Sequence, residues 1–283
     1  MQYIQHRGSA VPLVGIGTYR LGEDCRMRER EAEAFSLGVE SYGMTLIDTA
    51  EMYGNGVSEA FVGSMIKSCD RSKLFIVDKI LPHNAQKGLY YESCSRSLEL
   101  LGTDRIDLYL LHWRSGVQLQ DMVDNMQSLV QKGLIKRWGV SNFDTDDMRE
   151  LLECDGGSSC FCDQILYNLK TRGPEFDLIP YCKRNSVLVM AYSPLCQSAY
   201  DRKLVTDDKI VAQVAQREGK SPESLMLSFV IRNKDIITVF KTSSAEHLAN
   251  NMKNVFEPIS AEDMKLLSQR FSDPFRKTPL ETI

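Results

Sequence analysis

The sequence lacks long apolar runs and an excess of charge of one sign. No run of about 18 apolar residues occurs, so no transmembrane helix is predicted, and residues 1–7, MQYIQHR, contain no apolar signal core. The formal net charge is only -4, and the basic residues are scattered, so neither a nucleic acid nor a membrane surface is indicated as a partner. We therefore expect a cytoplasmic protein.

Cysteine is not scarce, but its spacing argues against a structural role. The 8 cysteines are irregularly spaced in a long chain without an export signal, a pattern that favours reduced thiols over disulfides. The one close pair, Cys160 and Cys162, opens an apolar run, and His and Cys nowhere cluster at zinc spacing. We therefore expect neither disulfides nor a metal site.

A long linker rich in Pro, Gly or Ser is also missing, as are low-complexity tracts and breaks in composition. The 283 residues, 43% of them hydrophobic, could fill one barrel or two small domains. The uniform composition favours a single domain over residues 1–283.

The chain does contain a repeated alternation of short β-like runs and amphipathic helical stretches. Most of the runs are nearly continuous in Val, Ile and Leu, as expected of parallel strands covered on both faces. Eight such runs span residues 14–19, 45–50, 74–80, 106–112, 137–142, 161–167, 187–192 and 237–242. Eight β/α units in succession predict a closed (β/α)8 TIM barrel.

The main competing fold is an open, doubly wound sheet. Such a sheet would carry G-x-G-x-x-G after its first strand to bind a dinucleotide, whereas residues 15–20 read GIGTYR and lead into no helix. The barrel is therefore favoured. Residues 1–12 include a turn-like Arg7-Gly8-Ser9 and are expected to form a β-hairpin that closes the bottom of the barrel.

Glycine and serine positions mark several helix ends. Two apolar helical faces stop at Gly102 and Gly133, which suit the left-handed position after a helix. Ser221, followed by proline, predicts the start of an additional helix before the last strand. Ser243, with a glutamate three residues later, predicts a capping box that opens a helix after that strand. We thus expect additional helices near the C-terminus.

Polar side chains with chemical capacity stand where the apolar runs stop, which is the catalytic end of such a barrel. Taken singly, each has an ordinary interpretation as a turn, capping, packing or solvated residue. Four chemically complementary groups on three successive strand ends favour a catalytic site, and these groups are Asp48, Tyr53, Lys79 and His112.

Five segments resemble the aldo-keto reductase superfamily in order and spacing. They are GTY at 17–19, DTAEMYG at 48–54, LLHW at 110–113, GVSNF at 139–143 and AYSPL at 191–195. The resemblance covers nearly the whole chain and looks most like bacterial members that reduce methylglyoxal and other small aldehydes. It implies an NADP-dependent oxidoreductase that reduces small aldehydes or ketones to alcohols by direct hydride transfer.

The resemblance also implies roles for the four catalytic residues. Tyr53 would be the proton donor, although an unperturbed tyrosine with a pKa of about 10 is a poor acid at neutral pH. A nearby ammonium lowers that pKa, so Lys79 is expected beside Tyr53, with Asp48 holding Lys79 in its charged form. His112, as a neutral donor, would orient the carbonyl oxygen. The implied substrate-binding set is Tyr19, Tyr53, His112 and Trp113.

A bed for NADPH is implied in the same way. Ser141, Asn142 and Gln164 would hydrogen-bond the carboxamide, and Tyr192 would stack on the nicotinamide ring. Lys241, just before a helix N-terminus, suits the 2′-phosphate, and NADH would serve at lower efficiency. The whole implied set is Gly17, Thr18, Asp48, Ser141, Asn142, Gln164, Tyr192, Ser193, Leu195, Lys241, Thr242, Ser243, His247, Asn250 and Asn251.

Two positions depart from the family pattern. His247 stands where many members carry an arginine for the 2′-phosphate, which bears on the preference for NADPH. Cys196 stands where a glycine usually follows the AYSPL segment. An inert small side chain is favoured there over a redox-sensitive one.

Two other functions stay open at this point. A regulatory or binding subunit of the same fold would have little turnover, and the absence of a long added tail argues against it. A barrel isomerase or aldolase using Lys79 as a Schiff-base amine is conceivable, but the implied cofactor bed argues against it. We expect a small carbonyl substrate, no nucleic-acid or membrane partner, and a monomer or weak oligomer.

Overall fold

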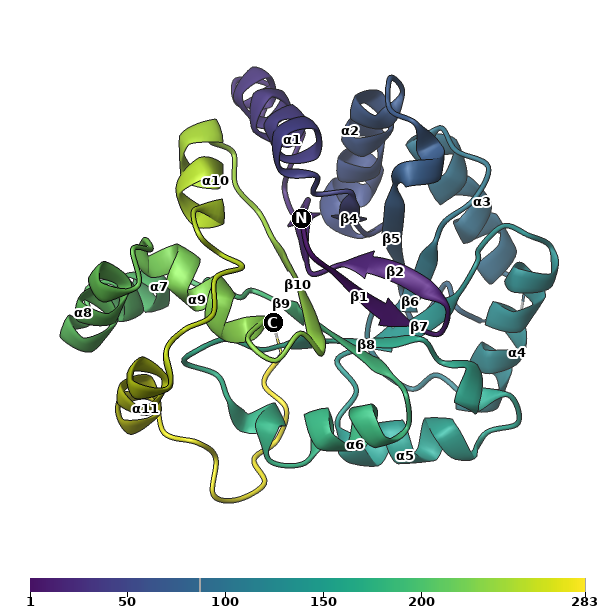
Figure 1. Ribbon diagram of the computed structural model, residues 1–283. Helices are drawn as coiled ribbons and strands as arrows, with labels where there is room; N and C mark the ends of the chain where they lie inside the picture. The colour runs from purple at the N-terminus through teal and green to yellow at the C-terminus, as the bar shows by residue number, and fades with distance from the viewer. Residues whose placement is uncertain (87, 283) are drawn as a thin grey trace.

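The computed structural model describes residues 1–86 and 88–282. In this part of the chain, eight parallel strands close into a barrel in the order β10-β3-β4-β5-β6-β7-β8-β9, with helices around it (Figure 1). The strands are β3 (Val14–Gly17), β4 (Leu46–Asp48), β5 (Phe75–Ile80), β6 (Leu108–Leu111), β7 (Trp138–Ser141), β8 (Cys162–Leu166), β9 (Leu188–Tyr192) and β10 (Ile236–Phe240). The predicted (β/α)8 barrel is confirmed.

The strands are apolar throughout because both of their faces are covered. Nearly every strand residue of the barrel is buried, with the inner face packed in the barrel and the outer face packed against helices. Seven of the described strands lie within their predicted runs, while β10 begins one residue earlier than predicted. Close strand packing also needs glycine, since a Cβ at Gly139 would lie 2.3 Å from the Cys162 carbonyl oxygen.

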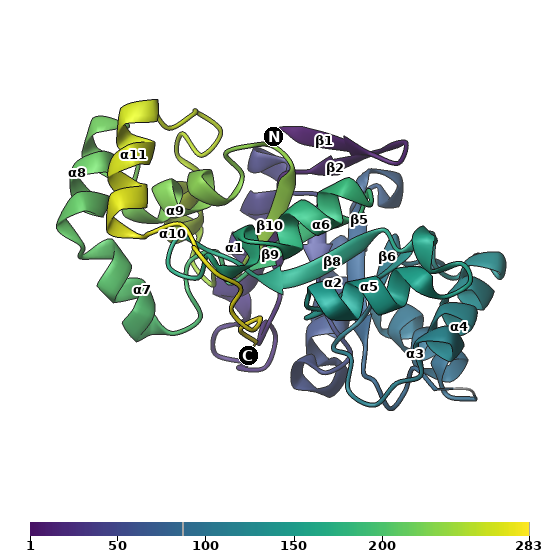
Figure 2. The same ribbon diagram turned by 90° about the horizontal axis from the view of Figure 1, so that it is seen from below.

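The helices form the outer layer around the barrel (Figure 2). They are α1 (Arg28–Tyr42), α2 (Val57–Ile66), α3 (Tyr90–Leu101), α4 (Leu119–Gln131), α5 (Thr145–Glu153), α6 (Leu178–Arg184), α7 (Ala199–Thr206), α8 (Lys209–Arg217), α9 (Pro222–Val230), α10 (Ala245–Met252) and α11 (Ala261–Arg270). Three of those described, α7 to α9, lie between β9 and β10, so the predicted additional helices are confirmed.

Three of the four predicted helix ends are confirmed, and one is wrong. Gly102 and Gly133 have left-handed φ values of 61° and 74°, and Ser221 caps α9 by accepting a bond from the Ser224 N–H. Ser243, however, does not open α10. Ser244 is the N-cap, because its own N–H donates to the Thr242 hydroxyl in a turn that delays the helix by one residue.

The predicted N-terminal hairpin is also confirmed. Strands β1 (Tyr3–His6) and β2 (Ser9–Pro12) pair antiparallel around Arg7 and Gly8. The His6 ring packs edge-on against Phe161 at 4.7 Å, and the Arg7 side chain donates to the Ser186 carbonyl at 2.9 Å. Because these partners precede β8 and β9, the hairpin lies at the N-terminal end of the barrel, and the opposite end is left for the site.

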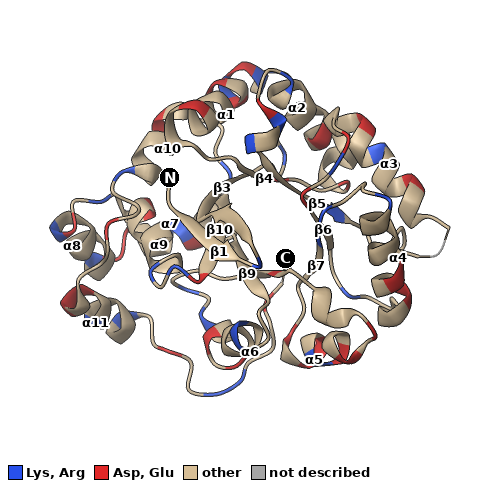
Figure 3. Ribbon diagram, turned by 45° about the vertical axis from the view of Figure 1, so that its right-hand side comes forward, with Lys and Arg blue, Asp and Glu red and all other residues tan. Residues whose placement is uncertain are grey.

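In the view of Figure 3, the outer helices carry charges of both signs. No helix in residues 1–86 and 88–282 is both long and apolar enough to cross a membrane. All 8 cysteines lie in that range and are free thiols.

Asp163 in β8 is a buried carboxyl without a compensating cation. Its exposed fraction is 0%, and within the described residues both of its carboxyl oxygens are buried without a hydrogen-bond partner. Burial raises the pKa of Asp163 well above its ordinary value, which favours the neutral carboxylic acid in the folded protein. The unfolded chain, by contrast, releases this proton above a pKa of about 3.9.

We therefore expect Asp163→Asn to stabilise the protein, and to do so more at pH 8 than at pH 4. Because the folded-state pKa is raised, the contribution of Asp163 to stability is full below the unfolded pKa and is lost as the pH rises. The gain in the free energy of unfolding at pH 8 should be about 1 to 4 kcal/mol in urea titrations. Asp155→Asn, at an exposed carboxyl, is the control; a gain that does not grow with pH would contradict the argument.

Candidate active site

The C-terminal ends of the barrel strands surround a pocket with about 1220 Å³ of open space. Most of the predicted site residues line it, which brings together side chains from all parts of the sequence. The predicted residues that do not line it are Lys79, Thr242, Ser243, His247, Asn250 and Asn251. The residues that line it without having been predicted are Met52, Pro194, Cys196, Gln197, Arg202, Val239 and Phe240.

Lys79 lies buried beneath the pocket, with an exposed fraction of 1%. Its Nζ donates to both carboxylate oxygens of Asp48, each at 2.8 Å, and to the Thr49 carbonyl at 2.9 Å. Burial by itself lowers the pKa of Lys79, but the Asp48 carboxylate and Tyr53 outweigh burial, and the pKa is raised. Lys79 is therefore charged and held by bonds that fix its position.

Tyr53 follows β4 and opens a short 3-10 turn, Tyr53–Gly56. Its hydroxyl lies 3.2 Å from the Lys79 Nζ, as expected from the sequence. The expected fall in the pKa of Tyr53 is wrong, however. Burial raises the pKa of this phenol, and the Lys79 ammonium, which lowers it, only partly offsets the rise because Asp48 adds a negative charge beside it. Tyr53 is thus fully protonated around neutral pH.

His112 follows β6 and lies beside Tyr53, with the two ring centroids 5.9 Å apart. Burial, and then the charge of Lys79, lower the pKa of His112 to about 3. The imidazole is therefore neutral at physiological pH. The ring centroids of Trp113 and His112 are 5.0 Å apart, and those of Tyr19 and Tyr53 are 5.2 Å apart. Aromatic rings therefore lie beside both the imidazole and the phenol.

The predicted cofactor residues join the same network. Gln164 donates from Nε2 to an Asp48 oxygen at 2.7 Å, so Asp48 is bonded by Gln164 and by Lys79. The Ser141 hydroxyl donates to the Gln164 carbonyl at 2.8 Å. These bonds tie β4, β5, β7 and β8 together at one level of the barrel.

Asn142 connects this network to the other side of the pocket. Its backbone is left-handed, with φ 62°, a conformation that asparagine tolerates better than most residues. Its side chain donates to the His112 carbonyl at 3.1 Å and accepts from the Tyr192 hydroxyl at 2.7 Å. The predicted carboxamide residues and Tyr192 are thus held in place by one another.

The segment after β9 returns over the pocket and brings residues that the sequence analysis missed. Cys196 has a left-handed φ of 65°, which explains why glycine would suit this position. Burial raises the pKa of the Cys196 thiol to about 11, which disfavours the reactive thiolate. Arg202, in the first turns of α7, lines the pocket although it is ten residues beyond β9. The cap at Ser198 was the one local signal for this helix.

The predicted residues from Thr242 onward lie outside the pocket, before and along α10. Lys241, which lines the pocket, donates from Nζ to the Ser243 hydroxyl at 2.8 Å. His247 and Asn250 are exposed, whereas Asn251 is buried, with an exposed fraction of 6%. Among the described residues, no three His, Cys, Asp or Glu side chains are grouped as metal ligands would be.

The sequence as a whole matches known reductases. The model of the aldo/keto reductase family matches residues 13–270. The methylglyoxal reductase YeaE of Escherichia coli (strain K12) is 37% identical over 281 residues, which cover 99% of this chain and 98% of that protein. The methylglyoxal reductase DkgB of Yersinia pestis is 29% identical over 264 residues, 92% of each chain.

Solved structures agree over nearly the full length. An aldo-keto reductase from Klebsiella pneumoniae in complex with NADPH has a TM-score of 0.95 and 37% identity, and the match covers 100% of this chain and 99% of that one. Another structure from the same organism, in complex with NADP and acetate, has a TM-score of 0.94 and 38% identity over 98% and 97% of the two chains. The family match and these full-length likenesses show that this chain belongs to the aldo/keto reductase family.

Proposed function

We propose that this protein reduces small aldehydes and ketones to alcohols with NADPH. The observation that carries the proposal is the charged Lys79 held between Asp48 and the Tyr53 hydroxyl, next to a neutral His112 at the pocket wall. The naming of its relatives as methylglyoxal reductases and the presence of NADP or NADPH in its structural neighbours support the substrate class and the coenzyme.

The donor set of the pocket fits a nicotinamide dinucleotide. Its lining includes the amide and hydroxyl groups of Ser141, Asn142 and Gln164, which offer a carboxamide both donors and acceptors. It also includes two cationic side chains, Lys241 and Arg202, which suit phosphates. Tyr192 offers a ring for stacking. NADPH, when bound there, supplies the hydride to the carbonyl carbon.

The chain's own residues supply the proton and the electrostatic support. The raised pKa of Tyr53 keeps its hydroxyl protonated, so it is ready to donate to the carbonyl oxygen as negative charge develops there. The phenolate left behind is then stabilised by the Lys79 ammonium 3.2 Å away. His112, being neutral, donates a hydrogen bond that orients the carbonyl oxygen without competing as an acid.

The surroundings of Lys79 argue against a mechanism in which it forms a Schiff base. An amine must be neutral to attack a carbonyl, and Lys79 is charged. It is also enclosed, with its three donors directed at Asp48, Thr49 and Tyr53. An assay of NADPH oxidation with a small aldehyde would distinguish the proposed enzyme from a regulatory subunit of the same fold. The enzyme should oxidise NADPH, whereas the regulatory subunit would have little turnover.

We expect Tyr53→Phe to abolish nearly all carbonyl reduction while leaving NADPH affinity within a few fold. The lost hydroxyl acts on the developing oxyanion and not on the coenzyme, so kcat should fall about 100-fold or more. NADPH oxidation and fluorescence titration of NADPH binding measure the two quantities. Tyr200→Phe, at an exposed tyrosine of α7, is the matched control. A variant that keeps a tenth of wild-type turnover would show that Tyr53 is not the acid.

Small reactive carbonyls should be reduced far better than bulky ones such as steroids. Tyr19 and Trp113 have exposed fractions of 51% and 36%, so the substrate side of the pocket is open and offers little surface to hold a large molecule. Missing remote contacts lower kcat/KM. The comparison is of methylglyoxal and nitrobenzaldehydes with steroid ketones, and a steroid with the highest kcat/KM would refute this assignment.

The preference for NADPH over NADH should rise when arginine replaces His247, if this position contacts the 2′-phosphate. Arginine presents a planar, bidentate set of donors that matches a phosphate better than an imidazole does. His247→Arg should therefore raise the ratio of kcat/KM for NADPH to kcat/KM for NADH. Because His247 is exposed, the rise should be about tenfold at most. Steady-state kinetics with the two coenzymes measure this ratio, and no gain from arginine would place His247 away from the phosphate.

A further inference from the structure

Two carboxyl side chains lie behind the strand that carries Lys79. Successive residues of a strand point to opposite faces, so Asp78 points away from the pocket and toward the helices while Lys79 points inward. Asp78 has an exposed fraction of 0%, and Glu59, on α2, has one of 1%. The Asp78 Oδ1 also accepts the backbone N–H of Lys79 at 2.8 Å. Asp78 therefore contacts the backbone that positions Lys79.

The fold encloses this pair between helices and barrel. A Cβ at Gly63 of α2 would lie 2.3 Å from the Leu100 carbonyl of α3, so glycine allows these helices to approach closely over β5. Tyr109 of β6 is the register partner of Asp78, and its hydroxyl is buried without a hydrogen-bond partner in the described part of the chain. The titratable or polar groups that face the pair are Glu51, Cys94, Arg96, Ser97 and Tyr109, with Lys79 on the other face of the strand.

The two carboxyl groups need a proton between them. They lie close enough for each to affect the pKa of the other, and in the described part of the chain neither forms an ion pair, although the charge of Arg96 acts on Glu59 and that of Lys79 acts on Asp78. One oxygen of each, Glu59 Oε1 and Asp78 Oδ2, is buried without a conventional donor. Two adjacent buried carboxylates repel strongly, and burial together with the Glu59 charge raises the pKa of Asp78 well above its ordinary value.

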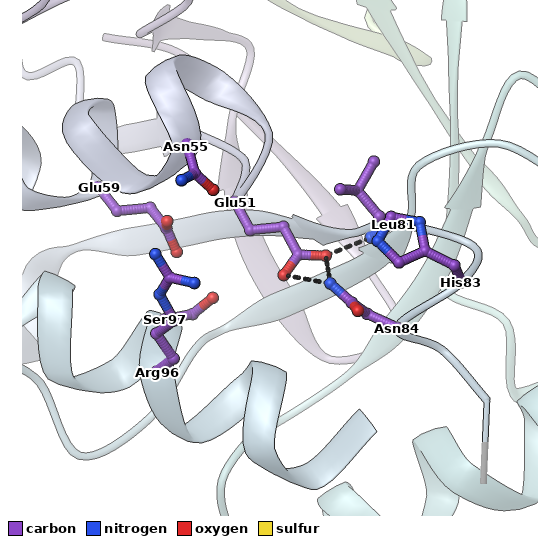
Figure 4. A pocket seen from close by; sticks show the side chains of 8 residues that line it. All are labelled: Glu51, Asn55, Glu59, Leu81, His83, Asn84, Arg96 and Ser97. Carbon is purple, nitrogen blue, oxygen red and sulfur yellow. Dashed lines mark hydrogen bonds between the residues drawn. The ribbon is translucent and has the colours of Figure 1, made fainter. Parts of the chain in front are cut away.

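The pair nevertheless has a route to water. Glu59 and Ser97 line a polar cavity with about 550 Å³ of open space, which shares no lining residue with the active-site pocket. Figure 4 shows the Arg96 guanidinium directed toward Glu59, while Glu51 is engaged by Leu81 and Asn84. A proton released by the pair can pass to water in this cavity. The pair can therefore change its charge with pH although it is buried.

That charge acts on the proton donor. After burial and the Asp48 charge, negative charge on Asp78 is a further cause that raises the pKa of Tyr53. A second negative charge behind β5 would oppose the phenolate that Tyr53 becomes when it donates its proton. The same charge would act on Lys79 through one strand thickness. The state of the pair is thus coupled to the chemistry without any contact with substrate.

We propose that Asp78 and Glu59 are positioning residues that share one proton behind Lys79, and that carbonyl reduction slows when this proton is lost. The inference rests on the proposed reductase function. Its consequence is a pH dependence that originates outside the active-site pocket. Loss of one proton from the pair leaves Tyr53 protonated but opposes its conversion to phenolate, which would account for the effect.

The test measures the single-turnover rate of NADPH oxidation with methylglyoxal by stopped flow from pH 6 to pH 9. In the wild type the rate should fall about 3- to 10-fold across this range, because one added negative charge behind β5 would oppose the phenolate of Tyr53. In Asp78→Asn and Glu59→Gln the pair cannot gain the second negative charge, so the rate of each variant should change by no more than about twofold between pH 6 and pH 9. Ser97→Ala is the control, because Ser97 is a neutral neighbour of Glu59. This variant should show the same fall in rate with pH as the wild type.

A second readout does not need activity. The infrared difference spectrum between the wild type and Asp78→Asn should contain the C=O stretch of a protonated carboxylic acid at pH 6, and this band should weaken toward pH 9. A wild type that lacks the band, a flat wild-type rate profile, or equal falls in wild type and both carboxyl variants would overturn the proposal. Absence of any NADPH oxidation would instead refute the reductase function, and the infrared titration would still decide whether the pair shares a proton.

Discussion

A buried ammonium is the constraint around which this site is built. Lys79 has no access to water, and a charge in that position is stable only if its donors are used by oxygen atoms. Asp48, Thr49 and Tyr53 provide those oxygens, which fixes the positions of the β4 end, the following loop and the phenol together. The barrel supplies this arrangement because β4 and β5 are neighbours in register.

The ammonium also determines the state of the groups around it. It contributes to keeping His112 neutral, and it offsets part of the rise that burial causes in the pKa of Tyr53. The Asp48 carboxylate is shared with Gln164, which links the ion pair to the amide end of the pocket. Charge, proton donor and coenzyme contacts are therefore not separate parts, since a shift in Asp48 would disturb all of them.

Acidic residues on the outer face of the barrel add a second layer. Asp78 precedes Lys79 on β5, and Asp163 precedes Gln164 on β8, so each buried carboxyl lies back to back with a site residue. Neither forms an ion pair with a lysine or arginine in the part of the chain that the structure describes, and burial raises the pKa of both. Alternation along a strand places both carboxyls there, because the residue before an inward-facing group must face the helices.

The strands, the hairpin, three of the four predicted helix ends and the four catalytic candidates could be predicted from the sequence alone, because periodicity, glycine positions and strand ends are local features. The predicted coenzyme residues came instead from the resemblance to a known family. The sequence could not place Arg202 in the pocket or bring Glu59 to Asp78, since those contacts arise only when a loop returns or helices pack over the barrel. The direction of the Tyr53 pKa shift was likewise decided by tertiary structure. A neighbouring lysine can be inferred from sequence, but the burial that outweighs it exists only once the barrel has closed.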